Sequence, residues 1–131
     1  MRTWTNQGRV YNMKDQHLQA EQAFKKALAL DSTYALAHFH LGMLYIDQKW
    51  EEKGVSELKQ GLKYSPGDPM GCLALGMIYM ENGQTKEARA IVTQALQRPI
   101  TNQDLHRKLV LLLTQTEKRG PLPPLDAVPT L

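Results

Sequence analysis

Four histidines and one cysteine are the side chains of this 131-residue sequence best suited to hold a metal ion or act as a nucleophile. His38 and His40 stand two residues apart, which is about 200° around a helix, so their rings cannot face one metal ion. No H-E-x-x-H or C-x-x-C pattern occurs, and Cys72 has no second cysteine with which to complete a zinc site. We therefore predict no metal site. The other histidines are His17 and His106.

Patterns that would support catalysis are also absent from the sequence. There is no G-x-S-x-G segment, and the glycines are spread along the chain instead of clustering in a phosphate-binding loop. The adjacent carboxylates Glu51 and Glu52 fit the beginning of a helix, where the helix dipole stabilises negative charge. We predict no catalytic residue, no cofactor and no enzymatic activity.

The glycines instead follow a 34-residue repeat. The segment LGMLY at residues 41–45 recurs as LGMIY at residues 75–79, and the same interval leads back to Gly8 and Tyr11. Small residues form two further columns, and bulky apolar residues form one between them: Ala20, Gly54 and Ala88; Ala27, Gly61 and Ala95; Phe24, Leu58 and Val92. Small residues let two helices approach, and bulky ones fill the space that remains. The repeat therefore predicts pairs of antiparallel helices.

Seven helices are expected, over residues 1–14, 17–30, 34–48, 51–64, 69–82, 85–98 and 103–119. Asp68 reads as an N-cap, because Pro69 follows it at the first helical position. Gly120 is expected to end the last helix. Four prolines among the next nine residues favour an extended tail over residues 120–131.

Charge and hydropathy argue against two kinds of partner. The chain has 16 Lys and Arg against 13 Asp and Glu, a net charge of +3, and no segment concentrates the positive charge, so we expect no nucleic acid. The longest apolar run covers residues 109–113, far short of the roughly 20 residues that span a bilayer, so we expect no membrane span. A single cysteine and a polar N-terminal segment favour a cytoplasmic location.

The repeat resembles the tetratricopeptide repeat, in which W-x2-L-G-x2-Y precedes A-x3-F, A and P. The first copy has Trp4, Gly8, Tyr11, Ala20, Phe24 and Ala27; the second has Leu41, Gly42, Tyr45, Leu58 and Pro66; the third has Leu75, Gly76, Tyr79, Ala88 and Ala95. The resemblance implies an all-α fold, a right-handed α–α superhelix of helix–turn–helix repeats. It divides the chain into repeats 1–34, 35–68 and 69–102, a terminal helix 103–119 and the tail 120–131. His38, Cys72 and His106 fall in the tryptophan column, where packed core residues are expected.

The resemblance also implies a non-catalytic protein–protein interaction module, or scaffold, that binds a peptide of a partner in a concave, Met-rich groove. Apolar anchors of the peptide would occupy the middle of the groove, and acidic residues would face the basic side chains at its two ends. The predicted groove residues are Arg2, Asn6, Arg9, Leu36, Phe39, His40, Met43, Asp47, Met70, Leu73, Met77, Arg107 and Lys108. Equivalent positions include Met80, Glu81, Leu111 and Gln115.

One ligand known in the family does not fit. Members that clamp the C-terminal carboxylate of heat-shock chaperones use Lys, Asn, Asn, Lys and Arg, where this chain has Thr5, Arg9, His40, Met70 and Ala74. Two alternatives to a ligand groove remain open, namely packing of these residues against one another and contact with a second copy. Two alternative functions also remain: a small chaperone of a secretion or assembly system, similar to type III secretion translocator chaperones, and an accessory domain of a larger enzyme or complex.

The terminal helix is expected to be apolar nearly all round, because Val110, Leu111 and Leu112 accompany Leu109 and Leu113. The end of a repeat array normally presents a polar outer face. We therefore expect this helix to be covered, either by the tail through Leu122, Leu125 and Val128 or by another chain in a homo-oligomer.

Overall fold

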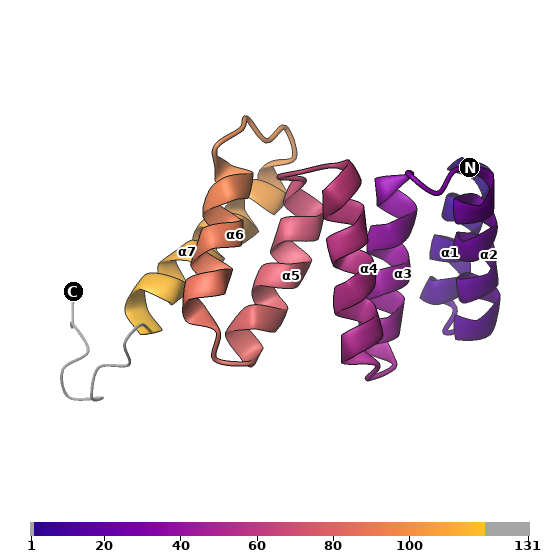
Figure 1. Ribbon diagram of the computed structural model, residues 1–131, viewed down its shortest axis with the longest axis horizontal. Coiled ribbons are helices and arrows are strands. Elements are labelled where there is room, and N and C mark those ends of the chain that lie inside the picture. The colour runs from indigo at the N-terminus through magenta and orange to yellow at the C-terminus, as the bar shows by residue number, and fades with distance from the viewer. Residues whose placement is uncertain (1, 120–131) are drawn as a thin grey trace. The chain divides into compact units, whose positions relative to one another are not determined.

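A computed structural model describes residues 2–119, and this range consists of seven α-helices without strands (Figure 1). The helices are α1 (Arg2–Met13), α2 (His17–Leu30), α3 (Ala35–Asp47), α4 (Glu51–Tyr64), α5 (Pro69–Glu81), α6 (Thr85–Leu96) and α7 (Gln103–Arg119). The predicted all-α fold is confirmed, and α2, α4 and α7 have the predicted bounds. The predicted tail, residues 120–131, lies outside the described range. One compact unit ends at Pro66 and a second begins at Gly67; they are called the first and second units below.

The same turn joins the two helices of each repeat. The first helix ends before a residue with positive φ, which is Asp15 (59°), Lys49 (69°) or Gly83 (76°). The N–H of the following residue donates to the carbonyl oxygen of the tyrosine five positions earlier: Gln16 to Tyr11 at 2.9 Å, Trp50 to Tyr45 at 2.8 Å and Gln84 to Tyr79 at 2.7 Å. This Schellman arrangement satisfies carbonyl groups that the helix end leaves without partners. The tyrosine column thus marks where each first helix ends.

One hydrophobic cluster of the first unit lies between α2 and α3. Its buried members are Ala20, Phe24, Leu41, Leu44 and Tyr45, with Tyr11 and Leu28 partly buried against them. These residues belong to the columns that the repeat predicted, except Leu28 and Leu44. Full burial of a side chain the size of Phe24 or Leu44 stabilises the fold by about 1.5–3 kcal/mol. This cluster therefore joins the second helix of one repeat to the first helix of the next.

Two glycines let α3 and α4 approach each other. A Cβ atom built on Gly42 would lie 2.9 Å from the carbonyl oxygen of Gly54, and one built on Gly54 would lie 2.8 Å from the carbonyl oxygen of Gly42. Real Cβ atoms essentially never come this close to another heavy atom. Glycine at both positions is therefore required by the distance between the two backbones, as the repeat predicted for Gly42.

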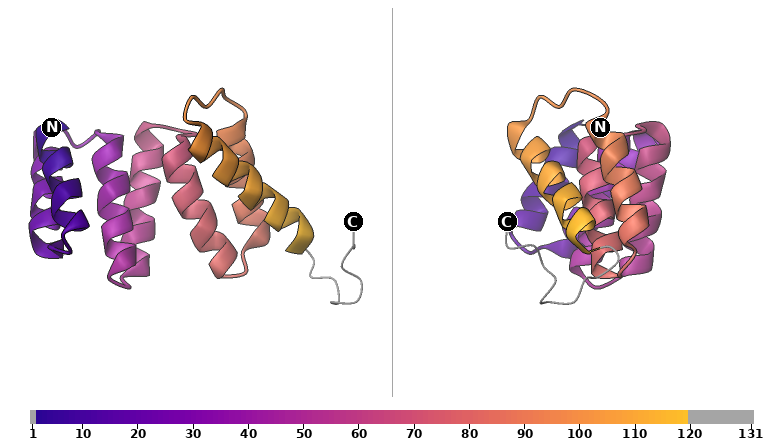
Figure 2. Two further views of the ribbon diagram at one scale, coloured as in Figure 1. Left: turned by 180° about the vertical axis from the view of Figure 1, so that it is seen from behind. Right: turned by 90° about the vertical axis from the view of Figure 1, so that its left-hand side faces the viewer.

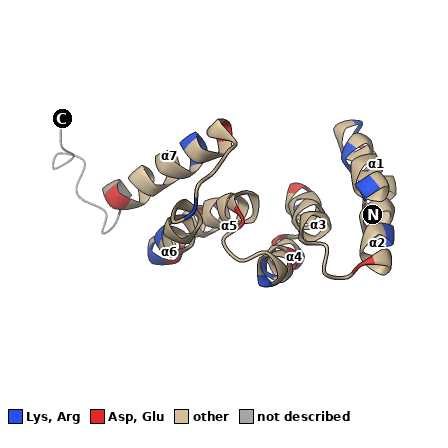
Figure 3. Cartoon of the chain, turned by 90° about the horizontal axis from the view of Figure 1, so that it is seen from above, with Lys and Arg blue, Asp and Glu red and all other residues tan. Residues whose placement is uncertain are grey.

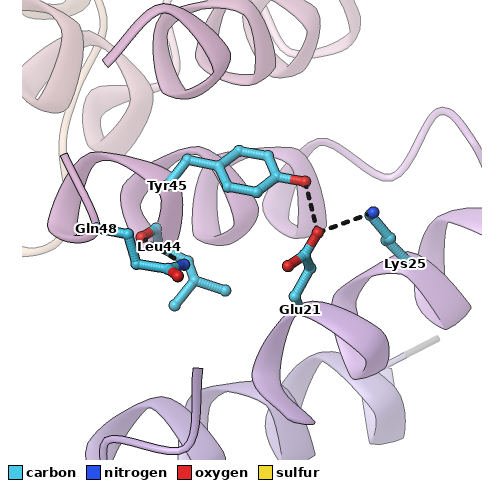
Figure 4. A network of polar contacts seen from close by, with 5 residues as sticks. All are labelled: Glu21, Lys25, Leu44, Tyr45 and Gln48. Carbon is cyan, nitrogen blue, oxygen red and sulfur yellow. Dashed lines mark hydrogen bonds and ion pairs between the residues drawn. The ribbon is translucent and has the colours of Figure 1, made fainter. Parts of the chain in front are cut away.

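A polar network links α2 to α3 beside this core (Figure 4). The Tyr45 hydroxyl donates to Glu21 Oε2 at 3.0 Å, and the ammonium of Lys25 lies 2.8 Å from the same oxygen. The hydrogen bond from Lys25 is the main reason that the pKa of Glu21 lies below its ordinary value. Lys53 of α4 lies 5.6 Å from the ring centre of Tyr45 and 5.1 Å from that of Trp50. Tyr45 of α3 therefore contacts both α2 and α4.

In the second unit, α7 packs obliquely against α5 and α6 (Figure 2). The predicted N-cap of α5 is confirmed, because Asp68 Oδ1 accepts hydrogen bonds from the N–H groups of Met70 at 3.0 Å and Gly71 at 3.4 Å. No helix within residues 2–119 is both long and apolar enough to cross a membrane.

Candidate functional site

The second unit carries an apolar hollow between α5 and α7. The contact that positions these helices is Gly76, where an added Cβ would lie 3.0 Å from side-chain atoms of both Leu112 and Val92. The close approach at Gly76 brings α7 alongside α5, while Leu109, Leu112 and Thr116 of α7 are buried. The side chains of α5 and α7 that lie beside this contact face each other across open space.

The hollow has a volume of about 720 Å³. It is lined by Leu73, Met77, Met80, Glu81, Lys108, Leu111, Leu112 and Gln115. Met77 is 50% exposed and Leu111 is 58% exposed, so the two side chains offer apolar surface to a ligand. The Lys108 ammonium lies 3.2 Å from Asp104 Oδ2. The hollow therefore combines an apolar centre with the ammonium group of Lys108 and the carboxylate of Glu81.

Arg89 of α6 holds the last turns of α7 in place. Its Nε lies 3.4 Å from Thr116 Oγ1, and a terminal guanidinium nitrogen donates to the carbonyl oxygen of Thr116 at 2.9 Å. The Thr116 hydroxyl donates in turn to the carbonyl oxygen of Leu113 at 2.6 Å. This connection fixes the α7 wall of the hollow against α6.

The predicted groove residues of the second unit divide between two surfaces. Leu73, Met77 and Lys108 line the hollow, and so do all four additional positions that the repeat register gave. Arg107 lies on another face of α7, and Met70 is half-buried near the beginning of α5. Leu112 is the one lining residue that the register did not place in the groove, and it is itself buried, as are Leu44 and Ile78 at the equivalent positions of the second and third repeats.

In the first unit, the expected exposure of Phe39 is wrong. Its side chain is 1% exposed, and a Cβ built on Gly61 would lie 2.6 Å from Phe39 Cδ1. Gly61 stands where the repeat pattern has alanine, and the ring of Phe39 fills the space that the missing methyl group leaves. Phe39 is therefore a core residue of the α3–α4 pair.

The other predicted groove residues of the first unit have mixed exposure. Arg2, Asn6, Arg9 and Asp47 are exposed, whereas Leu36, His40 and Met43 are half-buried. The ring of His40 stacks on Phe24, with 5.6 Å between ring centres and 9° between planes. Burial, assisted by the charge of Arg9, lowers the pKa of His40 to about 4. His40 is therefore a neutral ring at neutral pH.

The depressed pKa of His40 predicts loss of stability on acidification. An unfolded chain protonates this ring near pH 6.5, whereas the folded chain does so only near pH 4. The free energy of unfolding is thus expected to fall by about 3 kcal/mol as the pH decreases through this interval. Urea unfolding of the intact chain and of His40→Gln, measured across the interval, isolates this contribution because other groups titrate in both. Parallel pH profiles for the two proteins would contradict the assignment.

The remaining candidates for chemistry divide between the core and the surface. Both ring nitrogens of His38 are engaged: Nδ1 lies 2.8 Å from Glu57 Oε1, and Nε2 lies 2.8 Å from the carbonyl oxygen of Ser32. Cys72 is buried, and desolvation raises its thiol pKa to about 11. The expectation of a packed core histidine is confirmed for His38 and wrong for His106, which is exposed. Within residues 2–119, no group of three His, Cys, Asp or Glu side chains could hold a metal ion.

Comparison of the sequence with known protein families identifies the family of the chain. The family described as Tetratricopeptide repeat matches residues 2–34, 35–68 and 71–98, which is more than half of the chain. The chain belongs to the tetratricopeptide repeat family. The resemblance inferred from the 34-residue columns is confirmed.

A curated relative and solved tetratricopeptide repeat structures extend this result. The chain is 27% identical over 100 residues to the cell division cycle protein 27 homolog of Caenorhabditis elegans, and the match covers 76% of this chain but only 13% of that protein. The first tetratricopeptide repeat domain of Spaghetti (RPAP3), solved with an HSP90 peptide, is 12% identical with a TM-score of 0.77, covering 91% of both chains. The type III secretion translocator chaperone SycD of Yersinia enterocolitica is 11% identical with a TM-score of 0.81, covering 92% of this chain and 94% of that one. At these identities the structural matches establish the fold alone. Tetratricopeptide repeat domains as a class serve protein–protein interaction and are generally non-catalytic.

Proposed function

We propose that the chain is a non-catalytic interaction module and that the hollow between α5 and α7 holds an apolar segment of a partner protein. The observation that carries the proposal is the hollow itself, with Met77 and Leu111 exposed at its surface. An exposed apolar patch next to a concave surface is typical of an interaction site. The flexible thioethers of Met77 and Met80 suit a surface that adapts to differing apolar anchors.

The charges around the hollow add a preference for the partner's flanking residues. Lys and Arg lie near the beginning of α7, and its middle carries no charge (Figure 3). An acidic residue beside the apolar anchor would therefore lie near Lys108, which lines the hollow. Such exposed charges act mainly on the rate of association, and their effect decreases as salt is added. The complex of RPAP3 with an HSP90 peptide shows that this fold can hold a peptide.

A peptide library tests this function while the partner itself is unidentified. Random twelve-residue peptides selected on the intact chain should share apolar anchors, and their affinity is measured by fluorescence anisotropy. Met77→Glu should weaken the selected peptides at least tenfold, because it places a carboxylate in the apolar centre. The matched control is Met13→Glu, since Met13 is 83% exposed on α1 and lies in the other unit. Equal affinity for both variants, or failure to select any peptide, would refute the proposal.

A chaperone of a secretion or assembly system is the second candidate, and one observation favours it. The match to SycD extends over 94% of that chaperone, so the two chains agree over nearly the whole of that chain. A chaperone should raise the solubility of a client when the two are produced together, and Met77→Glu should abolish that effect. An accessory role in a larger protein or complex is supported instead by the match to a 13% portion of the cell division cycle protein 27 homolog.

A further inference from the structure

The outer face of α7 differs from the first helix of each repeat at one decisive position. Adding 34 residues to Gly76 gives Val110, so a valine stands in the column formed by Gly8, Gly42 and Gly76. A Cβ added at those glycines would lie 2.5 Å from Phe24, 2.9 Å from Gly54 and 3.0 Å from Val92, respectively. Val110 carries that Cβ and two further methyl groups. A helix cannot pack on α7 as closely as α2, α4 and α6 pack on their partners.

The face around Val110 is open in the described part of the chain. A second hollow, of about 570 Å³, is lined by Gln103, His106, Arg107, Val110, Leu111 and Thr114. Val110 is 41% exposed, and no carboxylate lines this hollow, although Arg107 does. His106 is exposed for the same reason, since its column is covered only where a second helix follows. The face around Val110 therefore suits an extended apolar segment that carries a negative charge next to Arg107.

The chain that follows α7 has this chemistry. Leu122, Leu125, Val128 and Leu131 recur at every third residue, a spacing that would put them along one edge if the segment were a polyproline II helix. Such a segment advances about 3.1 Å per residue, against about 1.5 Å per residue for a helix. If the chain reversed its direction at Gly120 and ran back along α7, each residue of the extended segment would span the length of about two residues of the helix. Leu125 would then lie level with residues 109–111 and Asp126 with Arg107.

We propose that residues 120–131 cover the outer face of α7 within the same chain, with Leu125 against Val110 and Leu111 and with Asp126 beside Arg107. The proposal is independent of ligand binding between α5 and α7, except that Leu111 borders both hollows.

A spin label on the tail tests the contact in the intact chain. The only natural thiol, Cys72, is buried with its pKa raised to about 11, so a nitroxide reagent at neutral pH labels an introduced Ala127→Cys selectively. In the proposed contact, Ala127 would lie off the apolar edge and level with residue 105. Broadening of methyl signals should therefore be strongest at Leu105, weaker at Val110 and weakest at Leu113. A tail that stays free gives the reverse order, because Leu113 is nearest to the tether, and that order would overturn the proposal.

Two controls identify the occupant. Leu125→Ser in the labelled chain should abolish the broadening at Leu105, whereas Leu131→Ser should leave it, because residue 131 falls beyond the beginning of α7. A mixture of spin-labelled chains with separate, isotope-enriched chains should show no broadening. Broadening in that mixture would mean that a second copy occupies the face, and retention of the Leu105 effect in Leu125→Ser would remove the proposed contact.

Discussion

Phe39→Ala is expected to lower the free energy of unfolding by about 3–5 kcal/mol, the range for removing a fully buried aromatic ring. The ring is 1% exposed and occupies the space above Gly61, so its loss leaves a cavity between α3 and α4. Urea unfolding followed by circular dichroism measures the change. Met77→Ala is the control, because Met77 is 50% exposed and should cost less than about 1 kcal/mol. If Phe39→Ala were as stable as the unmodified chain but bound peptide more weakly, Phe39 would be a surface residue of the groove and its assignment to the core would be wrong.

Gly42→Val is expected to lower the free energy of unfolding by about 3 kcal/mol or more. The added Cβ would meet the backbone carbonyl of Gly54 at 2.9 Å and Leu58 Cγ at 3.0 Å, and a backbone atom cannot turn aside as a side chain can. The helices α3 and α4 must therefore separate, which disrupts the packing of both. The small gain in helix propensity from glycine to valine does not offset this.

Gln60→Val provides the comparison for Gly42→Val, since Gln60 is exposed on α4 and the same residue type is introduced. Thermal unfolding of both variants should show a large decrease in midpoint for Gly42→Val and a small change for Gln60→Val. Equal midpoints would show that the two helices tolerate a wider spacing than the glycines indicate.

The fold was predictable because the residues that pack the helices together recur at equivalent positions in three repeats. Gly42 and Gly76 lie at close helix contacts, and the carbonyl groups of Tyr11, Tyr45 and Tyr79 all accept the hydrogen bond that ends a helix. A single column could arise by chance, whereas several columns in register at 34 residues leave one arrangement of helices. Leu73, Met77 and Lys108, which the same register put in the predicted groove, line the hollow of the second unit.

The errors at Phe39 and His106 have one physical cause, which is that a column predicts burial only if the facing residue is the usual one. Gly61 replaces an alanine and makes room for Phe39, so a surface position became a core position. His106 belongs to a packed column, but within residues 2–119 no helix follows α7 to cover that column, so the side chain is exposed. Both outcomes depend on pairs of residues in different helices, which a column taken alone does not contain.

The order in which the helices touch has a consequence for how fast the chain folds. Every packed pair joins helices that are consecutive or next but one along the chain, such as α1 with α2 and α5 with α7. Short loops lose little entropy when they close, and chains with such local contacts fold in about microseconds to milliseconds. Folding of a repeat protein can begin in any part of the array, so either of the two compact units can form first. A newly made chain of this kind exposes its apolar columns only briefly.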